Sequence, residues 1–224
     1  MTHQHITDHI LEAGIIAIIR ADSSEQLLDA AQALADGGVT AIEVTMTTPN
    51  ALEVIRDASA KFGSGILMGV GTVLNDEMCI SAILAGAQFV VTPVTKPEII
   101  RVCHRYGKPI ASGVFTPTEA LLAHDAGADF VKLFPAEQLG PGYIKSILAP
   151  LPMLRVIPTG GVTTETAPAF LEAGCVALGA GTSLVSKEIL KSRDWPALTA
   201  RAAAFVKVIR ATRDAIKLQS ASPS

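Results

Sequence analysis

Short apolar runs alternate with longer amphipathic segments along nearly the whole chain. Residues 15–19 are all apolar, which is typical of a parallel strand buried on both faces. Seven further runs follow, and segments with polar starts and helical spacing separate them. The predicted strands cover residues 15–20, 39–45, 66–71, 87–92, 109–114, 128–135, 154–159 and 175–180.

Helices are predicted before the first strand and between the later ones. The clearest cover residues 3–13, 23–36, 141–148, 163–173 and 195–217. Their starts are indicated by capping residues, capping boxes or a first-turn proline. These signals are Ser23 with Gln26, Thr48 with Pro49, Asn75, Thr95 with Glu98, and Thr116 with Glu119.

Four glycines mark a repeat in the chain. Gly38, Gly86, Gly127 and Gly174 each stand where a predicted helix leads into the second, fourth, sixth or eighth strand. One such glycine is an ordinary helix end, but four at two-unit intervals indicate eight βα units. We therefore predict an α/β fold: a single (β/α)8 TIM barrel with a short N-terminal helix over residues 1–217, followed by a disordered tail at 218–224. An open doubly wound sheet is the alternative, but residues 20–23 lack the phosphate fingerprint that its first turn requires.

Composition excludes several classes of partner. The 224 residues are 49% hydrophobic, enough for one sizeable core. A net charge of -3 provides no cationic field for nucleic acid or an anionic membrane. Aromatic residues make up only 4%, which weakens a case for base stacking. We expect a small-molecule ligand.

The sequence indicates neither a metal site nor a set of disulfide bonds. Cys79, Cys103 and Cys175 are scattered and form no Cys-x-x-Cys pair. The histidines near the N-terminus have no cysteine or carboxylate cluster beside them. The apolar run at 15–19 is too short to cross a bilayer, and no basic signal-peptide opening precedes it. We expect a cytoplasmic protein without a metal or another cofactor.

A lysine stands in the middle of the sixth predicted strand. Side chains alternate along a strand, so Phe130, Lys132 and Phe134 share one face, while Val131 and Leu133 share the other. A buried ammonium group either finds an anionic partner or loses its proton, and a neutral lysine attacks carbonyl carbons. The alternative is a lysine whose charged end reaches solvent at the end of the strand.

The same alternation turns Glu43 and Thr45 inward on the second strand, with Ile42 and Val44 facing the helices. A buried glutamate and a buried lysine are each unfavourable alone but tolerable together. The pair is either a structural ion pair or an acid–base carboxylate beside a nucleophilic amine, which suits Schiff-base chemistry. Position at the carboxyl ends of barrel strands favours the second interpretation.

Glycine-rich turns follow the seventh and eighth strands. They read Thr159-Gly160-Gly161 and Gly179-Ala180-Gly181-Thr182. TIM barrels often bind phosphate at these two turns, with backbone N–H groups and a helix N-terminus. Glycines there are also common for steric reasons alone, so the two turns together carry the prediction.

Four blocks of the sequence resemble the 2-keto-3-deoxy-6-phosphogluconate (KDPG) and 4-hydroxy-2-oxoglutarate (KHG) aldolase family, in the right order between about Ile15 and Val185. The blocks are Ile42-Glu43-Val44-Thr45, Gly69-Val70-Gly71-Thr72-Val73-Leu74, Val131-Lys132-Leu133-Phe134-Pro135-Ala136-Glu137 and Pro158-Thr159-Gly160-Gly161-Val162. This resemblance implies a class I, metal-independent pyruvate aldolase on a TIM barrel, typically a homotrimer.

The resemblance also implies roles for individual residues. Lys132 matches the Schiff-base lysine and Glu43 the carboxylate that shuttles protons. Thr72, Pro93, Phe134 and Thr159 match the pyruvate end of the site, while Gly160, Gly161, Gly181 and Thr182 match the phosphate turns. Many members bind the substrate carboxylate with an arginine where this chain has Thr47, whereas Arg20 matches an arginine of another branch of the family.

The expected reaction is cleavage of KDPG to pyruvate and glyceraldehyde 3-phosphate, with cleavage of KHG to pyruvate and glyoxylate as a further activity. This chain has arginine at position 20 and threonine at position 47, unlike many members of the family. The galactonate epimer of KDPG is therefore an alternative substrate. A phosphosugar isomerase and a non-catalytic phosphometabolite-binding barrel are alternatives of other classes, because both would use the same phosphate turns.

Overall fold

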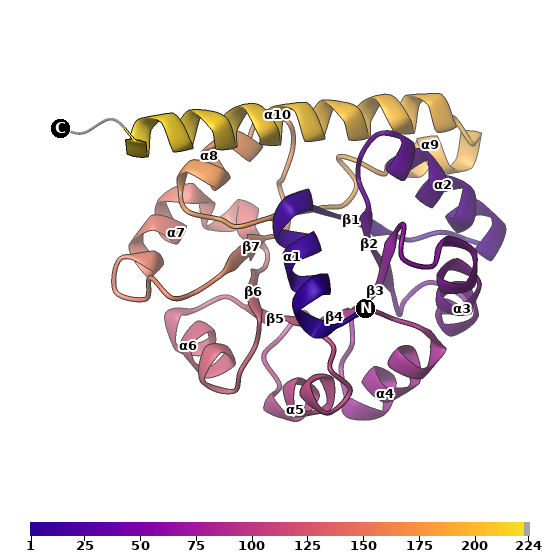
Figure 1. The fold of residues 1–224 in the computed structure, drawn as a ribbon, viewed down its shortest axis with the longest axis horizontal. Coiled ribbons are helices and arrows are strands. Elements are labelled where there is room, and N and C mark those ends of the chain that lie inside the picture. Colours follow the sequence, from indigo (N-terminus) through magenta and orange to yellow (C-terminus); the bar gives the residue numbers. More distant parts are fainter. Residues whose placement is uncertain (222–224) are drawn as a thin grey trace.

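The computed structural model describes residues 1–221, in which eight parallel strands alternate with helices around a ring (Figure 1). The strands are β1 (Ile15–Ile19), β2 (Ala41–Thr45), β3 (Leu67–Gly71), β4 (Phe89–Val91), β5 (Ile110–Val114), β6 (Phe130–Leu133), β7 (Val156–Pro158) and β8 (Leu178–Ala180). The helices are α1 (His3–Ala13), α2 (Ser24–Asp36), α3 (Ala51–Phe62), α4 (Asp76–Ala85), α5 (Pro97–Arg105), α6 (Pro117–Asp125), the 3-10 helix η1 (Ala136–Gln138), α7 (Gly140–Leu148), α8 (Ala167–Glu172), α9 (Lys187–Ser192) and α10 (Trp195–Ala221).

The strands form one sheet in the order β7-β6-β5-β4-β3-β2-β1-β8. Its two edges, β7 and β8, meet through a parallel bridge between Thr159 and Gly179 and a 3.0 Å hydrogen bond from the Val176 N–H to the Val156 carbonyl. The predicted TIM barrel is therefore confirmed. Because all the strands are parallel, their carboxyl ends lie on one face of the ring.

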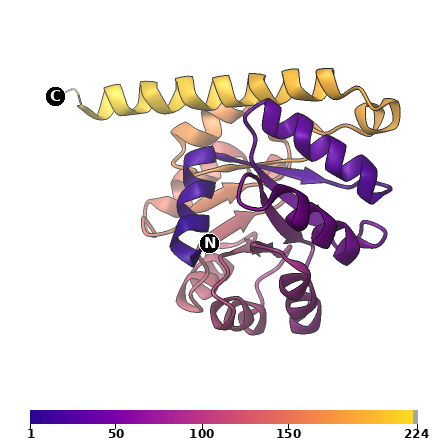
Figure 2. The same cartoon turned by 45° about the vertical axis from the view of Figure 1, so that its right-hand side comes forward.

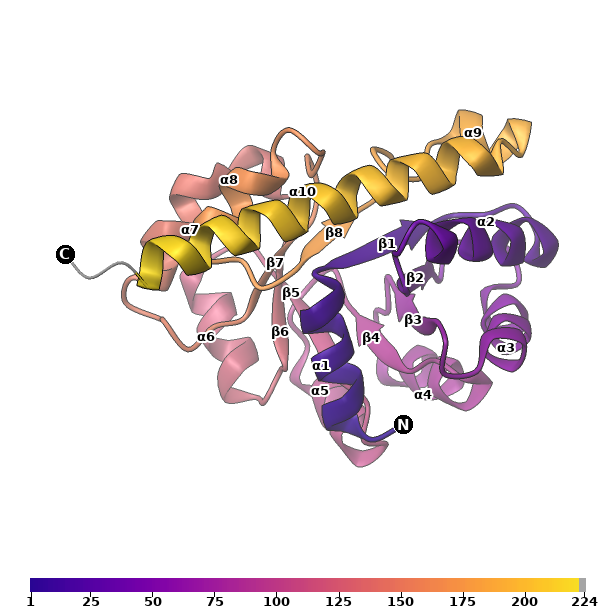
Figure 3. The same ribbon diagram turned by 45° about the horizontal axis from the view of Figure 1, so that its top comes forward.

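Side chains fill the inside of the barrel and close its amino-terminal end. Phe89 and Phe130 are buried there, and a Cβ at Gly69 would overlap the Phe89 ring. Helix α1 runs across this end of the ring (Figure 3) and adds Ile6 and Ile10 to the same apolar cluster. The end of the barrel at the carboxyl termini of the strands therefore remains available for a ligand-binding site.

Two N-terminal histidines tie α1 to the barrel. His3 Nε2 lies 2.9 Å from Asp129 Oδ1, and His9 Nε2 lies 2.7 Å from Thr40 Oγ1. Burial lowers the pKa of His9 below its usual value. Within residues 1–221, no three His, Cys, Asp or Glu side chains cluster in a way that could hold a metal ion. No helix in that range combines the length and apolar character needed to cross a bilayer.

The four repeated glycines have the backbone conformation that their positions predict. Gly38, Gly86, Gly127 and Gly174 have φ values of 89°, 118°, 92° and 102°. Positive φ carries little steric cost in glycine, so the chain can leave each helix and enter the next strand within a few residues.

Two predicted helix caps, those at Thr48 and Thr95, are wrong. Helix α3 begins at Ala51 after Asn50 in the left-handed conformation, because the Thr48 N–H donates to the Thr45 carbonyl and holds that segment in a turn. Helix α5 has Lys96 at its N-cap, and the predicted Thr95 hydroxyl instead donates to the carbonyl of Gly113 at 2.9 Å. By contrast, the capping box of Thr116 and Glu119 is formed as predicted.

Strands and late helices differ from their predicted lengths. Pairing covers only three residues in β4, β7 and β8, and η1 and α9 were not predicted. Helix α8 begins at Ala167 rather than at 163, because residues 163–166 form a hydroxyl-bonded turn. Helix α10 continues to Ala221, so residues 218–221 of the predicted disordered tail are helical, while 222–224 lie outside the described residues.

The long helix α10 packs along α2 and α8 and extends past the barrel (Figures 1 and 2). Near its end, the Arg213 guanidinium donates to the Glu12 carbonyl at 3.0 Å and the Val176 carbonyl at 2.6 Å. Burial lowers the pKa of Arg213 below its usual value. This side chain therefore joins α10 to the end of α1 and to the segment that enters β8.

We expect Arg213→Met to destabilise the fold, because it leaves two carbonyl groups without their charged donor. The expected loss is about 1.5–3 kcal/mol in the free energy of unfolding. The difference in the free energy of unfolding is measured by urea denaturation. Arg210→Met, an exposed position on the same helix, is the matched control. Equal midpoints for the two variants would contradict the role of Arg213.

Candidate active site

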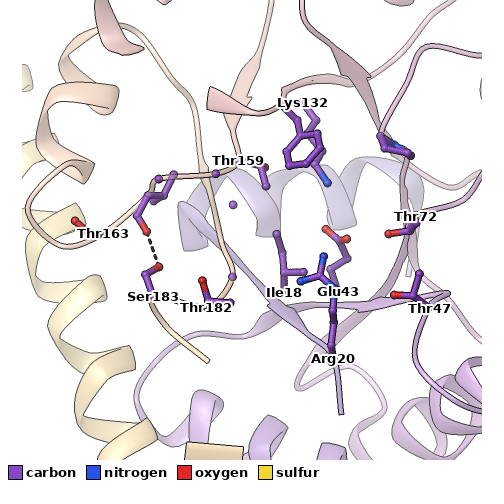
Figure 4. A pocket seen from close by; sticks show the side chains of 17 residues that line it. Ile18, Arg20, Glu43, Thr47, Thr72, Lys132, Thr159, Thr163, Thr182 and Ser183 are labelled. Atoms are coloured by element: carbon purple, nitrogen blue, oxygen red, sulfur yellow. Dashed lines mark hydrogen bonds between the residues drawn. The ribbon is translucent and has the colours of Figure 1, made fainter. Parts of the chain in front are cut away.

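One cavity of about 620 Å³ opens at the carboxyl-terminal end of the barrel (Figure 4). All the residues that the sequence assigns to catalysis, substrate binding and phosphate binding line it. They are Arg20, Glu43, Thr47, Thr72, Pro93, Lys132, Phe134, Thr159, Gly160, Gly161, Gly181 and Thr182. The structure thus brings together residues from every strand end except that of β5.

Lys132 reaches this cavity from the inner face of β6. Its side chain is 8% exposed, and Phe130 lies below it on the same face of the strand. Val131 and Leu133 belong to the outer core between strands and helices, as their alternation predicts. The amine lies 5.4 Å from the centre of the Phe134 ring, which therefore covers one side of it.

Glu43 enters from β2 and is 2% exposed. Its carboxyl group occupies space that is available because Gly71 on β3 has no side chain: a Cβ there would overlap the Glu43 carboxylate. Ile42 and Val44 face the outer core. The glycine at position 71, within the Gly69-Val70-Gly71-Thr72 block, is therefore needed to make room for the Glu43 carboxyl group.

Neither head group is committed to a partner within residues 1–221. In the described part of the chain, no hydrogen bond or ion pair involves the Lys132 amine or the Glu43 carboxylate, and these two groups lie more than 4.0 Å apart, too far for a salt bridge. A direct structural ion pair is therefore not formed. Both groups point into the cavity in Figure 4, where they are available to a bound molecule.

Hydroxyl groups and one cation lie near Glu43. Arg20 follows the end of β1, and Thr47 shares a 2.9 Å hydrogen bond with the buried hydroxyl of Thr45. Thr72 has a φ of 59°, a left-handed conformation that is strained for a β-branched residue. Strain of this kind persists where the surrounding structure enforces it, and it is common at functional sites.

Pro93 is positioned by contacts between β4 and β5. The Thr92 hydroxyl donates to the Val94 carbonyl at 2.8 Å and accepts the Gly113 N–H at 3.1 Å. A Cβ at Gly113 would collide with the Pro93 backbone. Glycine at 113 therefore lets the loop after β4 fold over the end of β5.

The two predicted phosphate turns face each other across one side of the cavity. Gly160 and Gly161 have φ values of 97° and 68°, and a Cβ at Gly181 would meet nothing within 4 Å. Among the described residues, the N–H groups of Gly161, Val162 and Thr182 have no acceptor. Backbone donors of this kind suit an anion. The helix N-terminus expected beside Gly161 is absent from this part of the described chain, because α8 begins only at Ala167.

Five residues that line the cavity were not among the predicted site residues: Ile18, Val162, Thr163, Gly179 and Ser183. Strand alternation could have indicated Ile18, because it lies two residues from the inward-facing Ile16. Ser183 donates to the Val162 carbonyl 21 residues away. No local pattern predicts that contact.

Known proteins resemble the chain over most of its length. The family model for KDPG and KHG aldolases matches residues 6–201. The 2-dehydro-3-deoxy-6-phosphogalactonate aldolase of Escherichia coli K12 is 36% identical over 197 residues, which cover 88% of this chain and 94% of that protein. The 2-dehydro-3-deoxy-phosphogluconate aldolase of Haemophilus influenzae is 33% identical over 195 residues, which cover 87% of this chain and 92% of that one.

A solved structure adds chemical information. The KDPG aldolase of Legionella pneumophila superposes with a TM-score of 0.83 at 27% identity, covering 89% of this chain and 97% of that chain. In that protein, pyruvate was captured as a covalent carbinolamine intermediate.

Proposed function

Because this chain belongs to the KDPG and KHG aldolase family and is a class I aldolase, we propose that it cleaves KDPG to pyruvate and glyceraldehyde 3-phosphate. The observation that carries the proposal is the convergence of an amine and a carboxylate in one cavity, neither of which has a hydrogen-bond or ion-pair partner within residues 1–221. Aldolase relatives favour this reaction over a phosphosugar isomerase or a non-catalytic barrel.

The reaction begins at Lys132. Its neutral amine attacks the C2 ketone, and loss of water from the carbinolamine gives an iminium ion. Glu43 takes the proton of the C4 hydroxyl, directly or through a water molecule, as the C3–C4 bond breaks and its electron pair moves into the iminium group. Glyceraldehyde 3-phosphate leaves. The remaining enamine is protonated at C3, and hydrolysis releases pyruvate and restores the amine.

The two ends of the substrate have different surroundings. We assign the carboxylate to Arg20 and to the hydroxyls of Thr47 and Thr72, because among the described residues Arg20 is the one cation besides Lys132 that lines the cavity (Figure 4). Pro93, Phe134 and Thr159 form the walls around the pyruvate unit. Gly160, Gly161, Gly181 and Thr182 hold the phosphate through backbone donors. A cavity of about 620 Å³ is within the usual size range for such a ligand.

A second candidate is the galactonate epimer of KDPG. Thr47 stands where many KDPG aldolases have arginine, and the cation is supplied instead by Arg20 from another strand. Moving the carboxylate contact changes how the substrate lies in the cavity, and therefore which C4 hydroxyl configuration reaches Glu43. The E. coli relative named for phosphogalactonate supports keeping this candidate.

Pyruvate release from KDPG, its galactonate epimer and KHG distinguishes these possibilities. We expect the highest kcat/KM with KDPG in an assay coupled to lactate dehydrogenase, and a lower value with KHG, which has no phosphate for the glycine turns. A higher value with the epimer would establish the second candidate. No pyruvate from any of the three would contradict the proposal.

The family resemblance also supports a homotrimer, which we propose as the assembly. Light scattering should then give three times the 23.3 kDa mass of the monomer. A monomeric mass would contradict it. A cytoplasmic location stays a prediction from the sequence.

A further inference from the structure

Hydroxyl groups outside the proposed substrate contacts hold two successive carbonyl groups of the turn after β7. The Thr166 hydroxyl donates to the Gly161 carbonyl at 2.8 Å. The Ser183 hydroxyl donates to the Val162 carbonyl, the bond drawn as a dashed line in Figure 4. Ser183 comes from the turn after β8, so its bond joins the two proposed phosphate turns.

These bonds determine where the N–H groups of the turn point. The Gly161–Val162 peptide is trans, so the Val162 N–H points away from the Gly161 carbonyl that Thr166 holds. Among residues 1–221, the Val162 N–H has no acceptor, whereas the Thr163 N–H donates to the Thr166 hydroxyl at 2.8 Å. The Thr166 and Ser183 hydroxyls thus bind carbonyl groups of the turn, and its unpaired N–H groups are available to a ligand.

Charge makes this orientation important. The cavity is lined by two cations, Arg20 and Lys132, and both lie across it from Ser183 in Figure 4. Arg201 does not line the cavity itself; it lines an adjoining pocket that shares Thr163, Thr182 and Ser183 with it. On the near side, the Glu137 side chain packs against Gly160 and Gly161 and adds a negative charge. A phosphate group held there depends on neutral backbone donors, whose strength falls steeply with misalignment.

We propose that Ser183 and Thr166 are positioning residues that give this aldolase its preference for phosphorylated over unphosphorylated substrates. The inference rests on the proposed function and adds a determinant outside the residues assigned to substrate contact. Without the Ser183 hydroxyl, the Val162 carbonyl loses its donor and the two turns lose their direct link. The turn after β7 can then shift relative to the turn after β8, so that the N–H groups of Gly161, Val162 and Thr182 no longer converge on the phosphate.

The test compares two aldehydes that differ only in the phosphate. Condensation of pyruvate with D-glyceraldehyde 3-phosphate and with D-glyceraldehyde is measured for the natural protein and Ser183→Ala. We expect kcat/KM for the phosphorylated aldehyde to fall about ten-fold, mainly through KM, as for the loss of a hydrogen bond to a charged group. The value for D-glyceraldehyde should change less than about two-fold, since charge and chemistry elsewhere are unaltered.

Three further variants sharpen the result. Ser183→Thr retains the hydroxyl and should restore most of the preference. Thr166→Val, which removes the other donor, should reduce it as Ser183→Ala does. Ser146→Ala removes an exposed serine that donates to the Gly142 carbonyl on α7, and should leave both aldehydes unaffected. An equal fall for both aldehydes with Ser183→Ala, or no change for either, overturns the inference.

A second measurement separates this inference from the proposed reaction. Titration with inorganic phosphate, followed by the NMR shifts of the Gly161 and Thr182 amides, needs no catalysis. Ser183→Ala should bind phosphate about ten-fold more weakly than the natural protein. Equal affinities overturn the inference even in an active enzyme. Failure of the natural protein to form a borohydride-trapped adduct with pyruvate would overturn the proposed reaction alone.

Discussion

Replacing Lys132 with methionine is expected to reduce pyruvate release by at least about 10⁴-fold and to abolish trapping of pyruvate by sodium borohydride. The variant has no amine to form the iminium ion, so the C3–C4 bond has no electron sink. Methionine has a similar length and is apolar, so it suits the buried position above Phe130. The coupled assay measures the rate, and mass spectrometry after reduction locates the adduct.

Two controls show whether loss of activity reflects loss of the nucleophile. Lys132→Arg keeps the positive charge but forms no Schiff base, so it should be as inactive as the methionine variant. Lys96→Met, at an exposed lysine, should retain full activity. The thermal midpoint of Lys132→Met should be unchanged or higher, because an apolar side chain replaces a buried polar one. An active Lys132→Met enzyme, or an adduct on another lysine, would remove the basis of the mechanism.

Glu43→Gln should have the second largest effect, lowering kcat by about 10²–10⁴-fold, while the borohydride-trapped adduct with pyruvate still forms. Glutamine nearly matches glutamate in shape and fits the space beside Gly71, but its amide cannot accept the C4 hydroxyl proton. The enamine also needs a proton at C3. We therefore expect the exchange of pyruvate methyl protons with deuterium, measured by NMR, to slow together with cleavage.

The matched control for Glu43→Gln is Glu53→Gln, an exposed glutamate on α3. It should leave cleavage, adduct formation and deuterium exchange unchanged. Full activity of Glu43→Gln would show that another group moves the protons. Loss of the trapped adduct in this variant would instead place Glu43 before the C–C bond cleavage, in formation of the Schiff base.

Much of the fold could be predicted because the burial of a helix or strand determines the spacing of apolar residues along it. A strand covered on both faces is apolar throughout, and alternation alone puts Lys132 and Glu43 inside the barrel. Gly38 and its three counterparts mark the returns to even-numbered strands, since a left-handed residue is required there. These are requirements on single residues or on near neighbours, so they can be recognised without the tertiary structure.

Errors arose where local signals compete with distant partners. Thr95 has the residue type and spacing of a capping box, but its hydroxyl binds the Gly113 carbonyl on another βα unit. The predicted helix began at residue 163, yet the Thr166 hydroxyl donates to the Gly161 carbonyl and residues 163–166 form a turn. In both cases a side chain able to cap a helix found an acceptor that the sequence does not reveal.

By itself, the sequence determined the order of the βα units, the inward faces of the second and sixth strands and the identity of most of the residues around the site. Tertiary structure decided how those residues meet: the separation of Lys132 from Glu43 beyond ion-pair distance, the left-handed Thr72 and the bond from Ser183 to Val162. The physical reason is the distance along the sequence over which each effect acts. Hydrophobic periodicity and turn chemistry act over a few residues, whereas these geometries depend on how separate units close into one ring.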